Sequence, residues 1–239
     1  LAPNGTLLAS TFDTDMTKEV MSVIGGELEP HGLDALLGPG MNIHRHPLCG
    51  RNFEYFSEDP YLTGKIAAAF CRGVSAFGGA ATPKHFAANG RETRRFECNA
   101  VMSERVAREI YLRGFEILIR ECEVRSIMTS YNLINGIHAT SNYDLLTVIL
   151  RGEWGYGGFV MTDWGAHMNA DESSPSGCYN TAEMVRAGGD IYMVTPDTEK
   201  YEDDMQSALD TGSLTRDDIA AAAGRLIEFI LTARKNKKS

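Results

Sequence analysis

The sequence predicts an α/β fold with a parallel sheet, of the (β/α)8 TIM-barrel type. Short apolar segments alternate with longer amphipathic ones, which is typical of strand–helix units around a parallel sheet. Several apolar segments also end in a titratable or aromatic residue, at the point where a barrel carries its chemistry. A doubly wound sheet shows the same alternation. No GxGxxG or Walker-type loop follows a predicted strand, however, so nothing supports the nucleotide-binding version.

Five apolar segments are predicted to be buried strands, because near-continuous apolarity is typical of parallel strands covered on both faces. They span residues 33–39, 79–86, 125–132, 158–164 and 189–194. A complete barrel has eight strands, so roughly three are missing, and the abrupt beginning suggests that they are the first ones. We therefore predict that residues 1–239 form one partial barrel domain.

Amphipathic helices are predicted between these strands. Asp59-Pro60 provides an acidic N-cap and a proline at the first helical position, so a helix is expected over 60–78. Ser103 opens a stretch in which apolar residues recur every three or four positions. The other helices are expected over 14–29, 142–154, 181–189 and 214–239, in addition to 103–122.

Charge and composition limit the partners. A net charge of −9 argues against a nucleic-acid partner, which would select a basic face. No run of about 18 apolar residues is present, so no transmembrane helix or membrane partner is predicted. The five cysteines are scattered without a CxxC motif, which favours free thiols in a reducing compartment and hence a cytoplasmic location. A homodimer stays open as an oligomeric state.

The strand ends carry Lys84, His85, Tyr131, Asp163 and Trp164. These side chains should meet at one edge of the sheet, because active sites of barrels lie at the carboxyl ends of the strands. A buried lysine is rare unless it is paired, and a tryptophan beside an acid suits the apolar face of a sugar. The alternatives are an N-cap role for the aspartate, core packing for the tryptophan and a structural role for the Lys-His pair.

Two further motifs are ambiguous. Arg51 lies in the charged loop GRNFEYFSEDP, where the charges either pair with one another or leave the guanidinium free to bind hydroxyls or a carboxylate. His44 and His46 have a spacing that suits a metal only with further ligands, and none is nearby. We predict no metal and no cofactor.

Four motifs occur in order: GPGMNIHRHPLCGRNFEYFSEDPYLTG, KHFAANGRET, SYNLINGIHATSN and LRGEWGYGGFVMTDW. Together they resemble the catalytic barrel of glycoside hydrolase family 3, of the β-glucosidase type, from about Pro3 to Val194. The resemblance implies a retaining hydrolase that releases terminal non-reducing β-D-glucose from β-linked glucosides or oligosaccharides. It also implies that Asp163 is the nucleophile and forms a covalent glycosyl-enzyme. The substrate-binding residues that it implies are Arg51, Lys84, His85, Met128, Tyr131 and Trp164.

The resemblance also implies parts that lie outside this sequence. The general acid/base is expected on a separate α/β sandwich domain, and the family's Asp-Gly-Pro segment is expected before residue 1. A barrel at the end of the chain is similar to members in which the sandwich comes first. Arg91 and Arg94 stand where relatives often have Gln and Asn. If an acid lies within the chain after all, Glu92 is the first candidate.

Alternative functions remain. A β-xylosidase of the same family differs in what it tolerates at the sugar's C6, and the absence of an acid allows a non-catalytic sugar-binding subunit. An N-acetylglucosaminidase of the family is disfavoured, because its loop after the Lys-His motif carries a histidine and ANGRETRRFECN has none.

Overall fold

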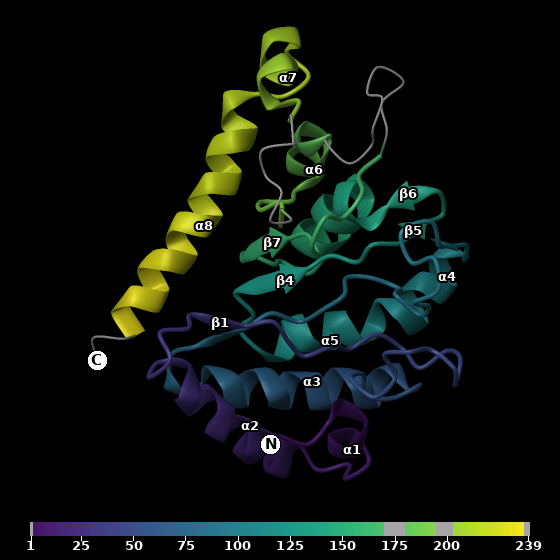
Figure 1. The fold of residues 1–239 in the computed structure, drawn as a ribbon, viewed down its shortest axis with the longest axis vertical. Helices are drawn as coiled ribbons and strands as arrows, with labels where there is room; N and C mark the ends of the chain where they lie inside the picture. Colours follow the sequence, from purple (N-terminus) through teal and green to yellow (C-terminus); the bar gives the residue numbers. More distant parts are fainter. Residues whose placement is uncertain (1, 170–179, 195–202, 237–239) are drawn as a thin grey trace.

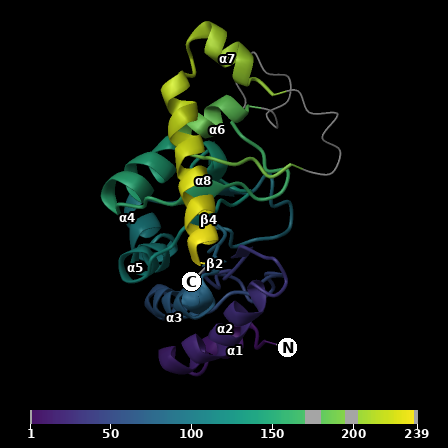
Figure 2. The same ribbon diagram turned by 90° about the vertical axis from the view of Figure 1, so that its left-hand side faces the viewer.

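A computed structural model describes residues 2–169, 180–194 and 203–236 (Figure 1). Strands β4 (Ser126–Met128) and β7 (Phe159–Met161) lie at the middle of the molecule, and a layer of helices covers one side of the sheet (Figure 1). The long helix α8 (Arg216–Asn236) runs along the opposite side (Figures 1 and 2). In the part of the chain that is described, no helix is long and apolar enough to span a membrane.

The five predicted strand segments are present as a parallel arc in chain order. β1 (Ala35–Leu36) pairs in parallel with β2 (Ala80–Ala81), and this ladder continues to a bridge between Gly40 and Lys84. A bridge between Phe86 and Thr129 connects the second segment to the third.

The third segment, β4, then pairs in parallel with β7, and a bridge from Met161 to Ile191 adds the fifth. The regular strands are shorter than the predicted ranges, but each lies inside its range. The pairing confirms the prediction of an incomplete (β/α) barrel.

Close helix packing on the outer face depends on small residues of α3 (Pro60–Val74). A Cβ atom on Gly73 would lie 2.5 Å from the carbonyl oxygen of Lys18 in α2 (Thr14–Leu28), so no side chain fits at that position. The predicted cap is confirmed, because Asp59 accepts hydrogen bonds from the first N–H groups of α3.

Two predicted α-helices contain π-helical turns. The segment 103–122 divides into α4 (Glu104–Val106), π-helix η2 (Ala107–Tyr111) and α5 (Arg113–Glu121). Its i→i−5 pattern includes the bond from Leu112 N–H to the carbonyl of Ala107, 2.8 Å long. The predicted helix 142–154 is π-helical η4 (Asp144–Glu153). The spacing of the apolar residues matches the 3.6-residue period of an α-helix and π-helical turns are rare, so the sequence does not predict them.

Several short elements were not predicted. Strands β5 (Leu133–Ile134) and β6 (Ile137–His138) form an antiparallel hairpin, which β3 (Asn99–Ala100) extends. Asn135 and Gly136 form its turn with positive φ values of 50° and 90°, in agreement with the turn signal of the Asn-Gly pair. Helices α1 (Gly5–Ala9), η3 (Ala139–Ser141) and α7 (Met205–Thr211) were not predicted either. In contrast, η1 (Ser75–Phe77) and α6 (Thr181–Ala187) lie inside the predicted helices 60–78 and 181–189.

The main apolar core lies between the strand arc and its helices. Phe86 contacts Phe115 of α5 and Trp154 in edge-on geometry, with ring centroids 5.0 and 5.9 Å apart. A smaller cluster packs Phe159 against Phe229 of α8, with centroids 4.8 Å apart. Four cysteines, Cys49, Cys71, Cys98 and Cys122, are free thiols, and Cys178 lies outside the described residues.

A buried ion cluster attaches α8 to the sheet. The side chain of Asp190 is fully buried at the start of the fifth strand segment. Its carboxylate oxygens lie 2.9 Å from Arg151 Nη2 and 2.7 Å from Arg225 Nη2, and one of them accepts the Val160 N–H. One carboxylate thus links η4, α8 and β7.

We expect Asp190→Ala to destabilise the protein by about 3–5 kcal/mol, because two largely buried guanidinium groups lose their carboxylate partner. The measurement is denaturant unfolding of the full-length protein. The control is Glu153→Ala, which removes an exposed carboxylate 2.7 Å from Arg108 and should cost far less. Equal losses in the two variants would contradict a stabilising role for the buried cluster.

Candidate active site

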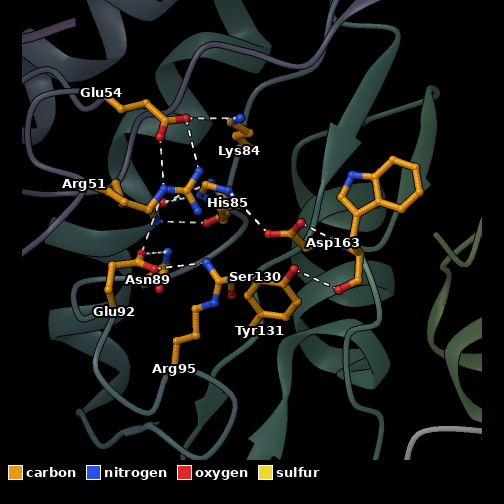
Figure 3. Close-up of polar contacts among 12 residues, drawn as sticks. Arg51, Glu54, Lys84, His85, Asn89, Glu92, Arg95, Ser130, Tyr131 and Asp163 are labelled. Atoms are coloured by element: carbon orange, nitrogen blue, oxygen red, sulfur yellow. Dashed lines mark hydrogen bonds and ion pairs between the residues drawn. The ribbon is translucent and has the colours of Figure 1, made fainter. Parts of the chain in front are cut away.

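The polar residues predicted at the strand ends come together in space (Figure 3). Lys84 and His85 follow β2, Tyr131 follows β4, and Asp163 follows β7. Arg51 reaches the same place from the loop that precedes α3. The arc of parallel strands aligns these ends, so residues as distant in sequence as 51 and 163 share one site.

Asp163 is nearly buried, with 7% of its surface exposed. Its Oδ2 atom lies 3.5 Å from His85 Nε2, and its Oδ1 atom accepts the N–H of Trp164 at 2.8 Å. No helix begins between this residue and residue 169, so the alternative role as an N-cap is not realised there. The carboxylate therefore keeps lone pairs directed at the site.

His85 is held firmly and is neutral. Its backbone N–H donates to Asn42 Oδ1, and its carbonyl accepts from Asn42 Nδ2. Burial lowers the pKa of the imidazole well below its ordinary value, and the charges of Arg51 and Lys84 lower it further.

Two oxygens lie near His85 Nδ1: the Tyr55 hydroxyl, which can donate, and Asn42 Oδ1 at 3.4 Å, which can only accept. Asn89 Nδ2 donates to the Tyr55 hydroxyl at 3.0 Å, and that hydroxyl lies 3.2 Å from His85 Nδ1. If the hydroxyl donates to Nδ1, the ring proton sits on Nε2 and is directed at Asp163. This assignment gives a continuous chain of hydrogen bonds that ends at the carboxylate.

Arg51 and Lys84 share one carboxylate. Glu54 accepts from Arg51 Nε at 2.9 Å and Nη2 at 3.2 Å, and its other contact is Lys84 Nζ at 3.1 Å. The charges of this loop therefore do pair with one another. Because of this pairing, the side chains of both cations point into the same site (Figure 3).

Arg95 is a site residue that the sequence analysis missed. Its guanidinium carbon lies 4.4 Å from the ring centroid of Tyr131, and its Nη1 atom lies 3.1 Å from Glu92. Arg94, which the sequence analysis singled out, instead pairs with Glu97 on the surface, and Arg91 is exposed. Only the fold of this loop distinguishes the three arginines, because they are close neighbours in sequence.

The three remaining predicted residues differ in exposure. The Tyr131 hydroxyl donates to the carbonyl of Trp164 at 2.8 Å, and burial together with the charge of Asp163 raises the pKa of Tyr131. Trp164 is 49% exposed, so it is not a core residue. Met128 is buried in an apolar cluster with Phe159, and its predicted substrate contact remains a prediction.

The charges of the site balance. Arg51, Lys84 and Arg95 face Glu54, Glu92 and Asp163, with neutral His85 and Tyr131 between them. Such a set of fixed donors and acceptors suits a neutral ligand with many hydroxyl groups. No cluster of three or more metal-ligating side chains occurs in the described ranges.

A family model described as the N-terminal domain of glycosyl hydrolase family 3 matches residues 1–229. The chain belongs to glycosyl hydrolase family 3. Within this family it is similar to a β-glucosidase of Ruminococcus albus, with 49% identity over 96% of the chain. It is also similar to thermostable β-glucosidase B of Acetivibrio thermocellus, with 39% identity over 99% of the chain.

The chain is also similar to solved structures of β-glucosidases. A β-glucosidase from Paenibacillus barengoltzii superposes with a TM-score of 0.92 and 52% identity over 96% of the chain. β-Glucosidase 3B from Thermotoga neapolitana, solved with glucose, superposes with a TM-score of 0.89 and 40% identity over 99%. The chain spans 24% and 30% of the two sequence relatives and 25% and 32% of these two structures.

The lowered pKa of His85 makes the stability of this family 3 domain depend on pH. Between the depressed folded pKa and the ordinary value of about 6.5, the unfolded chain binds a proton that the folded chain does not. The contribution of His85 to the free energy of unfolding is thus complete above about pH 6.5. It is lost as the pH falls, by up to about 1.4 kcal/mol per pH unit.

We expect His85→Gln to flatten this loss of unfolding free energy between about pH 6.5 and 5. The control is His31→Gln, which changes an exposed histidine at the end of α2. Unfolding by denaturant at several pH values measures both variants. An unchanged slope in His85→Gln would show that His85 binds protons alike in the folded and unfolded protein, which contradicts a lowered pKa.

Proposed function

We propose that the protein is a retaining glycoside hydrolase that releases terminal β-D-glucose from β-linked glucosides. The observation that carries the proposal is the position of Asp163 at the end of β7, next to His85 and Tyr131. The relatives described above support the substrate class, since those proteins are called β-glucosidases.

In this mechanism Asp163 attacks the anomeric carbon and the glycosidic oxygen leaves, which gives a covalent glycosyl-enzyme that water then hydrolyses. The transition state resembles an oxocarbenium ion, so a neighbouring carboxylate stabilises it. Arg51 and Lys84 would donate hydrogen bonds to sugar hydroxyls, and His85 would share its Nε2–H between Asp163, 3.5 Å away, and a hydroxyl. Trp164 would pack its exposed ring on the apolar face of the sugar.

The general acid/base belongs to another part of the protein in this proposal. Retaining hydrolysis needs a second carboxyl group about 5–5.5 Å from the nucleophile, and this group must carry a proton. Glu54 is paired with Arg51 and Lys84, and Glu92 is paired with Arg95 and accepts from Asn89. Both are already engaged with donors, so we infer that a separate sandwich domain supplies the acid.

The free thiols of the described residues support a reducing, cytoplasmic compartment as part of this proposal. The β-xylosidase alternative differs at the sugar's C6, and a β-xyloside is therefore the comparison substrate. A sugar-binding subunit without activity would bind glucose and hydrolyse neither substrate.

Asp163→Asn in the full-length protein should lower kcat for 4-nitrophenyl β-glucoside by roughly 10³-fold or more, because an amide cannot form the covalent intermediate. Asp210→Asn, at an exposed site on α7, is the matched control and should keep normal rates. Steady-state kinetics and glucose binding are measured for each variant. Near-normal kcat in Asp163→Asn would refute the assignment.

A further inference from the structure

Glu54 is the central acceptor of the cation pair in the site. One of its oxygens accepts from Arg51 Nε, and the other lies within hydrogen-bond distance of both Arg51 Nη2 and Lys84 Nζ. The two cations come from different segments of the chain, the loop before α3 and the end of the second strand segment. Figure 3 shows the carboxylate between them.

The backbone leaves room for this carboxylate. Gly40 is the bridge partner of Lys84 in the sheet, and a Cβ atom on Gly40 would lie 2.9 Å from Glu54 Cγ. The absence of a side chain at this position lets the stem of Glu54 pass over the strand and reach the cations. This close contact restricts the conformation of the Glu54 side chain, whereas the side chains of a surface ion pair are free to move.

The electrostatics of the site agree with this geometry. Burial alone would raise the pKa of Glu54, but the hydrogen bond from Arg51 and the charge of Lys84 outweigh it, so the pKa lies below its ordinary value. The side chains of Arg51, Glu54 and Lys84 are between 15% and 23% exposed. Without the carboxylate, two partly desolvated cations would repel each other at the point where a sugar has to bind.

We propose that Glu54 is a positioning residue, which orients the guanidinium of Arg51 and the ammonium of Lys84 toward the same sugar. The proposal rests on the proposed function and extends it to a residue that does not itself contact the reacting atoms. Its effect is on orientation: two donors with fixed directions bind the hydroxyls of a distorted ring better than two mobile ones.

Glu54→Gln in the full-length protein tests the proposal, because it keeps the shape and removes the charge. We expect kcat/KM for 4-nitrophenyl β-glucoside to fall about 10- to 100-fold, measured well below the melting temperature of the variant so that the protein is folded. Glu54→Asp should lie between the wild type and the Gln variant, since it keeps the charge at a longer distance. Glu97→Gln is the matched control, because it breaks an i,i+3 Arg–Glu pair on the surface.

A double-mutant cycle with Lys84→Met distinguishes positioning from general support of the fold. If Glu54 acts through Lys84, the fall in kcat/KM caused by Glu54→Gln should be at least about threefold smaller in the Lys84→Met background than in the wild type. If Glu54→Gln does not fold, two other variants test the proposal. They are Glu54→Asp and the double variant Glu54→Gln/Lys84→Met, in which one charge of each sign is removed.

Wild-type kinetics in Glu54→Gln, an Asp variant no better than Gln, or additive effects in the cycle would each overturn the positioning role. These outcomes all presuppose a wild type that hydrolyses the glucoside. A wild type that binds glucose and hydrolyses nothing would instead overturn the proposed function.

Discussion

Parallel pairing of successive strands is the constraint on which the site depends. Each segment of the arc lies beside the one before it, from β1 through β2, β4 and β7 to Ile191, so their carboxyl ends meet at one edge. The helices that return the chain pack through glycine contacts such as that of Gly73. The register of this arc determines the 3.5 Å contact between His85 and Asp163, residues that are far apart in sequence.

Charge balance is the second condition. Three cations gather beside the carboxylate of Asp163, and Glu54 and Glu92 offset the excess positive charge. Burial and the same cations lower the pKa of His85, which favours the neutral ring with one donor and one acceptor nitrogen. A site built in this way presents fixed dipoles and charges to a ligand, as electrostatic stabilisation of a transition state requires.

The sequence was enough to predict which strand-end residues lie together. It was not enough to predict the residues that they contact. Lys84 and Asp163 could be predicted because each directly follows an apolar strand, and a parallel sheet aligns such positions. Arg95 could not be distinguished from Arg91 and Arg94, because the conformation of one loop decides which arginine faces inward. The π-helical turns were not predicted either, because they are rare and the apolar spacing matches an α-helix.

The most direct test of the account is to trap the covalent intermediate on the full-length protein. A 2-deoxy-2-fluoro-β-glucoside with a good leaving group slows hydrolysis of the glycosyl-enzyme, so the sugar accumulates on the nucleophile. Peptide mass spectrometry then locates it. The account predicts the label on Asp163, in the peptide that contains Trp164. A label on another carboxylate, or turnover of the normal glucoside with no label at all, would contradict it.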